Sequence, residues 1–200
     1  MRRRLLVLLT ASLPLVAWSP AQAAPHRFAD LPWGADRSEA HPALTRQGWR
    51  LTRQAGYGDA VYAGTVDGHP ARATLKYDLL GRLVAVDLRV MPPEDRLLAA
   101  YRTMQNALTL RYGPPAYTQT SFRPPYRAGD GRAVEALKSQ HAVLDTVWFD
   151  RNALNLEARS GVQLDVRTVP FGRLEIQQFS LSNDWTEEYQ RRAGPAEEHF

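Results

Sequence analysis

His141 and Asp145 are the pair of side chains whose types and spacing suggest chemistry, because they lie four residues apart in a predicted helix. Such a pair could bind a metal ion, or act as a general base with the carboxylate that orients it. The histidine also continues an apolar stripe of that helix, formed by Val134, Leu137, His141 and Leu144. We therefore interpret His141 as a residue at the boundary of the core.

Sequence motifs of common catalytic sites are absent. The chain has no Gly-x-Ser-x-Gly, no His-Glu-x-x-His, no phosphate-binding Gly-Lys-Ser/Thr loop and no calcium-loop spacing of acids. It also has no cysteine, which excludes disulfides, thiol nucleophiles and thiolate ligands. We predict no catalytic residue, no metal site and no cofactor. Carboxylates that meet only in space are an alternative, but Asp78, Asp87, Asp165 and Glu175 are expected on the solvated faces of strands.

The segment from Gly113 to Gly131 is the longest stretch without a periodic pattern, and it is rich in proline, glycine, aromatic residues and arginine. Long loops in compact domains often carry function, and aromatic residues with arginine are enriched where interfaces bind most strongly. The candidate binding residues are Tyr117, Phe122, Arg123, Tyr126 and Arg127. The alternative, which we favour, is that these aromatic side chains cover the open side of the sheet.

The N-terminus has the three parts of a secretory signal peptide: Arg2 to Arg4, an apolar run from Leu5 to Trp18, and Ala21-Gln22-Ala23. We predict cleavage after Ala23 and a periplasmic or extracellular protein, with a retained anchor or a twin-arginine signal as alternatives. The apolar run is shorter than the roughly 20 residues that cross a membrane. With no cysteine to carry a lipid, we expect neither a lipoprotein nor a transmembrane segment after signal removal.

The charge of the chain changes when this signal is removed. The formal net charge of +4 comes from 25 basic and 21 acidic residues, and three of the basic residues lie in the signal. The 22 that are left nearly balance the acidic residues, so general attraction to nucleic acid is not expected. Individual arginines could still bind an anionic polymer or lipid, and the candidates are Arg72, Arg82, Arg89 and Arg173.

Alternation with a period of two predicts antiparallel strands in two groups, within residues 60–90 and 146–181. Asp67-Gly68 predicts a tight hairpin in the first group. In the second group, an apolar register that slips near Gln177-Gln178 predicts a bulge.

Helices are predicted on both sides of these strands. The clearest begins near Pro92-Pro93, ends at Gly113 and carries one apolar stripe: Leu97, Tyr101, Met104, Leu108 and Tyr112. Asp36 and Glu39 have the spacing of a capping box for a short helix. Asp130 is expected to open a second main helix, and Trp185 and Tyr189 to lie on a last short one.

These elements predict an α+β fold: an antiparallel meander of about six strands, in one continuous sheet, with two main amphipathic helices packed on one face. Residues 24–192 would form a single domain with possible halves 33–113 and 130–192, followed by a frayed tail, 193–200. Gly81-Arg82-Leu83 recurs as Gly172-Arg173-Leu174, each at a turn between strands. A duplicated unit of one helix and three strands would produce this recurrence.

Four short motifs occur together in the first half: Trp33-Gly34, Tyr62-x-Gly64-x-Val66-x-Gly68, Gly81-Arg82-Leu83 and Tyr112-Gly113-Pro114. Over residues 33–115 this pattern resembles small exported bacterial proteins and lipoproteins of unknown function. The resemblance implies a helix-and-sheet module used for binding and not for catalysis, and it assigns no functional residue. The missing cysteine departs from the lipoprotein members and argues against a membrane tether.

Three functions follow from this sequence. We favour a non-enzymatic exported module that binds another envelope or extracellular protein through the sheet and the Tyr117 to Arg127 loop. An exported hydrolase would need a cleft that encloses carboxylates or His141. A binder of anionic polymer or lipid would use the four arginines named above, and its retention would fall steeply with salt.

Overall fold

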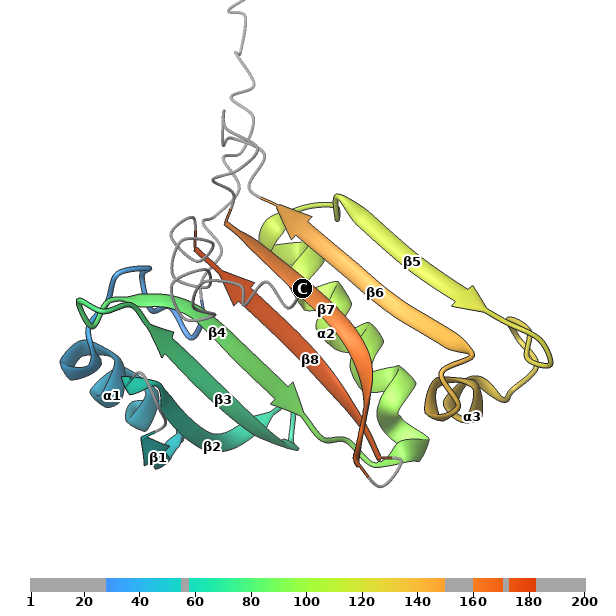
Figure 1. Cartoon of the computed structure of the whole chain (residues 1–200), viewed down its shortest axis with the longest axis horizontal. Coiled ribbons are helices and arrows are strands. Elements are labelled where there is room, and N and C mark those ends of the chain that lie inside the picture. The colour runs from blue at the N-terminus through green and yellow to red at the C-terminus, as the bar shows by residue number, and fades with distance from the viewer. Residues whose placement is uncertain (1–27, 55–57, 150–159, 171–172, 183–200) are drawn as a thin grey trace, which may run out of the picture.

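The structure is a computed structural model that describes residues 28–54, 58–149, 160–170 and 173–182 (Figure 1). Several predicted features lie outside these residues: the signal peptide, a strand near Leu156, the last short helix and the tail 193–200.

Eight antiparallel strands form one sheet in the order β1-β2-β3-β4-β8-β7-β6-β5. The strands are β1 (Arg50–Gln54), β2 (Ala60–Val66), β3 (His69–Tyr77), β4 (Leu83–Val90), β5 (Tyr117–Phe122), β6 (Ala142–Phe149), β7 (Gly161–Val169) and β8 (Arg173–Leu181). The helices are α1 (Arg37–Arg46), α2 (Leu97–Tyr112), preceded by a 3₁₀ turn (Glu94–Arg96), and α3 (Ala133–Lys138). The fold is therefore α+β with an antiparallel sheet.

The chain runs twice through a helix and four strands, with the short α3 added between β5 and β6 of the second half, and the two halves meet where β4 pairs with β8. The two Gly-Arg-Leu segments lead into equivalent strands, since Leu83 begins β4 and Arg173 begins β8, the last strand of each half. The expected unit of three strands is therefore wrong by one strand in each half, and the sheet has eight strands where we expected about six. The added strands include β1 and β5, which form its two edges.

The helices pack on one face of this sheet, with α2 behind β7 and β8 in the view of Figure 1. The predicted stripe of α2 is buried along its whole length and shares one core with inward-facing residues of the strands. Alternation gives β3 its two faces, because Ala73 and Leu75 are buried in this core while Arg72 is exposed on the other side. Below, the face on which none of the described helices packs is called the open face.

Local signals explain several element ends. Asp36 and Glu39 form the predicted capping box of α1. Asp67 and Gly68 both have positive φ, as a two-residue hairpin between β2 and β3 requires. Gly113, with φ of 82°, ends α2 in a conformation that glycine adopts without strain.

Two predicted details are wrong. β8 has no bulge, because its pairing with β4 and β7 runs without a shift through Gln177 and Gln178. Gln178 is buried on the helix side, and its amide donates to the Ser180 hydroxyl at 3.2 Å. The second main helix is only the six-residue α3, which begins after Arg132 and ends before His141.

The motifs of the resemblance have structural roles. The Gly34 amide donates to the Leu83 carbonyl at 2.9 Å, which joins the first motif to the start of β4. The Gly113 carbonyl accepts from the buried Trp148 indole at 3.2 Å. Gly64 lies against the Trp49 ring. These contacts give each motif a structural role in this fold.

Among the described residues, the longest helix, α2, has 16 residues, and no helix is long and apolar enough to cross a membrane.

Gly64→Ala tests this packing. A Cβ at Gly64 would lie 2.6 Å from two carbons of the Trp49 ring, which is buried, so the ring has to shift. We expect the free energy of unfolding, measured with urea, to fall by about 1–3 kcal/mol. Thr65→Ala, at an exposed neighbouring position, should change it by less than about 0.5 kcal/mol. An unchanged unfolding midpoint for Gly64→Ala would contradict the packing described here.

Candidate functional site

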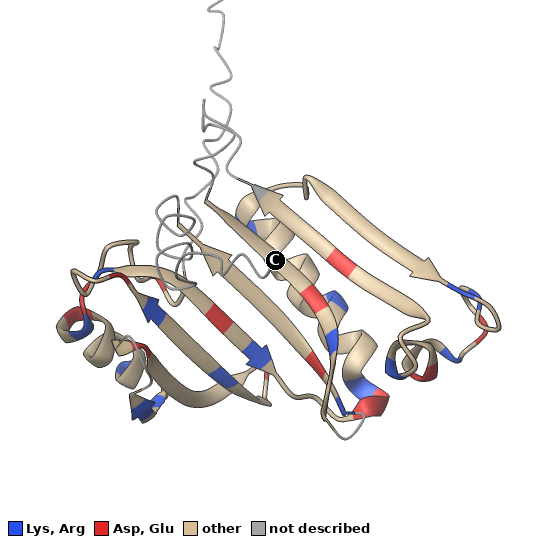
Figure 2. Cartoon of the chain, viewed as in Figure 1, with Lys and Arg blue, Asp and Glu red and all other residues tan. Residues whose placement is uncertain are grey.

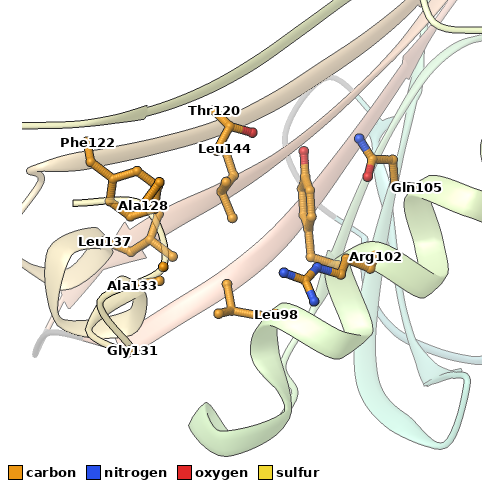
Figure 3. A pocket seen from close by; sticks show the side chains of 12 residues that line it. Leu98, Arg102, Gln105, Thr120, Phe122, Ala128, Gly131, Ala133, Leu137 and Leu144 are labelled. Atoms are coloured by element: carbon orange, nitrogen blue, oxygen red, sulfur yellow. The ribbon is translucent and has the colours of Figure 1, made fainter. Parts of the chain in front are cut away.

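A cavity of about 450 Å³ lies on the helix side of the sheet, between α2, the outer strands β5 and β6, and α3 with the loop before it (Figure 3). Its volume is in the range of small-molecule and side-chain binding sites. Much of its lining is apolar, from four elements: Leu98, Phe122, Leu137 and Leu144.

One flank of α2 forms the polar wall of this cavity. Leu98, Arg102 and Gln105 follow at helical spacing, one step around from the buried stripe, so they point to the same side. In Figure 3, the Arg102 and Gln105 side chains extend from the helix beside the cavity. Arg102 is exposed and has no carboxylate within ion-pairing distance among the described residues. Its guanidinium is therefore available to a bound group.

Tyr101 also lines the cavity, but its hydroxyl is held by the sheet. It lies 3.0 Å from the Thr146 hydroxyl and donates to the Leu164 carbonyl at 3.3 Å. Gln105 donates to the same Thr146 oxygen at 2.9 Å. Burial raises the pKa of Tyr101, so its phenol is neutral and unsuited to proton transfer near pH 7. These hydrogen bonds make this wall rigid.

The structure separates the five predicted binding residues. Phe122 lines the cavity and packs against the core, whereas Tyr117 is half exposed on the open face, where its hydroxyl donates to Gln119. Arg123 and Arg127 are exposed on the loop beside the cavity.

Tyr126 supports that loop. Its ring lies 4.6 Å from the Arg132 guanidinium and 5.7 Å from the His141 ring, and it is partly buried against the core. Phe122 and Tyr126 therefore both pack against the core, and Phe122 does so within the wall of a cavity.

The expected loop from Gly113 to Gly131 is wrong in its first part, because residues Tyr117–Phe122 form β5 at the edge of the sheet. Both faces of this strand carry exposed polar side chains, so it lacks the apolar alternation by which strands are recognised.

No strand in the described part of the chain pairs with the outer side of β5. The Arg123 amide donates to the His141 carbonyl of the neighbouring chain segment at 2.7 Å. Because inward and outward residues alternate in an antiparallel pair, the N–H and C=O groups of Thr118, Thr120 and Phe122 point away from β6. The side chains of Thr120 and Phe122 also line the cavity, so the free edge and the cavity adjoin.

The opposite edge of the sheet is built differently. β1 has five residues, its register with β2 shifts between Leu51 and Arg53, and it carries the exposed charges of Arg50 and Arg53. Short length, irregular register and charge are the features that prevent an edge from pairing with another strand. β5 has no charged residue and pairs with β6 in continuous register.

His141 and Asp145 do not form the pair suggested by their spacing. His141 lies before β6, outside α3, and its Nδ1 is 2.8 Å from the Ser139 carbonyl. Asp145, on β6, accepts from Gln163 at 3.1 Å. Among the described residues, no group of three histidine, aspartate or glutamate side chains could hold a metal ion.

The carboxylates expected in solvent are instead shielded. Asp78, Asp87 and Asp165 are buried, the last two on the open face, where Figure 2 shows acidic and basic positions on neighbouring strands. Their partners come from the same strand or from the next one: Asp165 accepts from Arg167 at 2.9 Å, and Asp87 from Gln177 at 2.7 Å.

Asp165 is only partly satisfied by these partners. Its Oδ1 is buried without a hydrogen bond, as is Oε1 of Gln177, which is directly opposite on β8. Burial raises the pKa of the Asp165 carboxyl, Arg167 opposes this, and Asp145 and Asp87 add to it. The folded state therefore favours the protonated acid.

No protein-family model, curated protein or solved structure matches this chain.

Asp165→Asn tests the cost of this buried carboxylate. The pKa of this carboxyl is higher in the folded protein than in the unfolded chain. Its ionisation therefore lowers the stability of the folded state as the pH rises above the ordinary value of 3.8. Asparagine removes the charge and provides a donor, so we expect the variant to be more stable at pH 7 by about 1 kcal/mol. The gain should shrink towards pH 3 in urea unfolding. A destabilised Asp165→Asn protein at pH 7 would contradict this account.

Proposed function

We propose that this protein is an exported, non-catalytic module that binds an extended segment of another envelope or extracellular protein along β5. In this proposal one apolar side chain of the segment enters the adjoining cavity. The observation that supports it most is that a free, uncharged strand edge borders an apolar cavity of about 450 Å³.

The backbone of β5 can supply the first part of this recognition. Thr118, Thr120 and Phe122 direct their N–H and C=O groups outward, and an added antiparallel strand would pair with them. Such main-chain hydrogen bonds give affinity with little dependence on the sequence of the partner.

The cavity can supply selectivity. Side chains of a strand alternate between its two faces, so every second residue of the added strand would point to the helix side. Neighbouring strands lie about 4.8 Å apart, so such a residue would stand beside Thr120 and Phe122, next to the cavity. A large aliphatic or aromatic side chain suits its lining of leucine and phenylalanine.

The charges around the cavity favour an acidic partner. Arg123 directly follows Phe122, Arg127 directly precedes Ala128, and Arg102 lies on α2. None of the three has an ion pair within the described part of the chain, whereas Arg132 is paired with Glu135. We therefore expect acidic residues on either side of the apolar anchor, since buried and rim charges at interfaces are arranged to be complementary.

The same cavity gives less support to a hydrolase. None of its lining residues carries a carboxylate, an imidazole or a thiol, and its Tyr101 hydroxyl is engaged with the sheet. Nothing in its wall can act as a general base near neutral pH. Binding is therefore the function we propose, and export rests on the predicted signal peptide.

Thr120→Pro tests the strand edge. The Thr120 N–H points outward, so proline removes a donor that a partner needs while leaving the pairing with β6 intact. We would select ten-residue peptides from a displayed random library and measure their affinity by fluorescence anisotropy. The variant should bind at least about tenfold more weakly, the loss of roughly one or two hydrogen bonds.

Thr118→Val is the matched control, because it changes an exposed side chain of β5 but keeps the backbone donor. It should bind as the wild type does. Selected peptides that bind equally to Thr120→Pro, or a library that yields no binder, would contradict the proposal.

Ala128→Trp tests the cavity. Ala128 is an exposed lining residue, so an indole there can occupy the cavity without entering the core. We expect the selected peptides to lose most of their affinity, and the preference for an apolar anchor to disappear from a new selection. Ala107→Trp, on the exposed side of α2, adds the same side chain away from the cavity and should have no effect. Equal effects of the two substitutions would exclude the cavity from the binding site.

A further inference from the structure

A second candidate site lies on the open face, at the end of the sheet where β3, β4 and β8 adjoin. A depression of about 150 Å³ is lined there by three arginines, one methionine and one glutamate: Arg72, Arg89, Met91, Arg173 and Glu175. Three of the four arginines that the sequence singled out therefore meet, although they come from three different strands. The fourth, Arg82, forms an ion pair with Asp78 at 2.7 Å and does not line this depression.

The arrangement of two of these arginines is unfavourable by itself. Arg72 and Arg89 are directly opposite in the register of β3 and β4, and like charges in such positions repel. Figure 2 shows these basic positions side by side on the two strands. A bound anion between them would convert the repulsion into attraction.

The carboxylates near this depression do not neutralise its surface. Asp87 and Glu175 have side chains only 12% and 13% exposed, and both lie near Arg89, at 3.2 Å and 3.9 Å. Arg89 is 47% exposed above them. The two carboxylates therefore form ion pairs with Arg89 while they are themselves mostly buried. The charged groups exposed to solvent are the guanidiniums.

Arg72 and Arg173 form no ion pair with the described residues that would stabilise the fold. Both are exposed, and neither has a carboxylate within ion-pairing distance among the described residues. Three guanidiniums against two carboxylates, Glu175 in the lining and Asp87 beside Arg89, leave a net charge of +1 at the depression. A positive charge favours a phosphate monoester, which carries about −1.5 to −2 at pH 7.

We propose that Arg72, Arg89 and Arg173 bind a phosphate monoester group. Guanidinium groups present paired N–H donors that fit phosphate oxygens, and the volume equals that of about five water molecules at roughly 30 Å³ each. A neighbouring depression of about 270 Å³ shares Met91, Arg173 and Glu175 and adds Pro92, Pro93, Glu94 and Leu174. It leaves room for the organic part of the ligand.

This site is independent of the proposed peptide site. Arg89 alternates along β4 with the buried Leu88 and Val90, so it lies on the face opposite the helices and the cavity. Loss of one activity in a variant should therefore leave the other unchanged.

The test uses two probes on the full protein. Inorganic phosphate is titrated by calorimetry at constant ionic strength, and vesicles with phosphatidic acid or with phosphatidylglycerol are tested by sedimentation. Arg72→Gln and Arg173→Gln should each weaken phosphate binding by about tenfold, as expected for the loss of one charge-assisted contact. Arg53→Gln, which removes an exposed unpaired charge from β1, is the matched control and should bind as the wild type does.

The outcomes distinguish the source of the phosphate group. Phosphate binding that depends on Arg72 and Arg173 supports the proposal for a soluble ligand. Binding only to phosphatidic acid vesicles, with the same dependence, supports it for a lipid headgroup. Absence of binding to both probes, equal weakening by Arg53→Gln, or full binding by Arg72→Gln and Arg173→Gln would overturn it. Circular dichroism checks that the variants fold.

Discussion

The antiparallel pairing of β4 with β8 is the interaction on which the rest of the structure depends. It joins the last strands of the two halves in unbroken register, from Ala85↔Leu181 to Val90↔Ile176, and makes one sheet from eight strands. The first strands of the halves, β1 and β5, are thereby placed at the two edges. After β4 the chain has to cross four strand spacings, about 19 Å, to reach β5. The 16 residues of α2, about 24 Å long, lie behind the sheet on this path (Figure 1).

This route explains where the candidate sites lie. α2 packs behind the central strands and reaches β6 at Thr146; among the described residues, the rest of β5 and β6 is covered on that side by the six residues of α3 and the loop before it. The space that α3 and this loop leave over β5 and β6 is the cavity. It lies beside β5, the edge strand without a charged residue. None of the described helices packs on the other face of the central strands, and there the buried acids and exposed arginines gather. The two sites thus follow from one asymmetry between the faces of the sheet.

Elements with a one-sided pattern could be predicted from the sequence, and elements defined by tertiary contacts could not. The stripe of α2, the Asp67-Gly68 hairpin and the capping box at Asp36 were all predicted, because each is specified by residues close together in the chain. β5 was missed, since an edge strand exposed on both faces shows no apolar alternation. Burial of Asp87 and Asp165 was also missed, because Gln177 and the neighbouring strands that shield them are distant in sequence or set by register. Of the five predicted binding residues, only Phe122 lies in the cavity wall.

The account's central claim is that an extended segment of a partner adds to the sheet at β5. Amide hydrogen exchange, followed by NMR with and without a bound peptide, tests it residue by residue. The amides of Thr118, Thr120 and Phe122 point outward, so they should exchange rapidly in the free protein and slowly in the complex, while those of β1 stay unchanged. Protection confined to the open face, or none along β5, would contradict the claim.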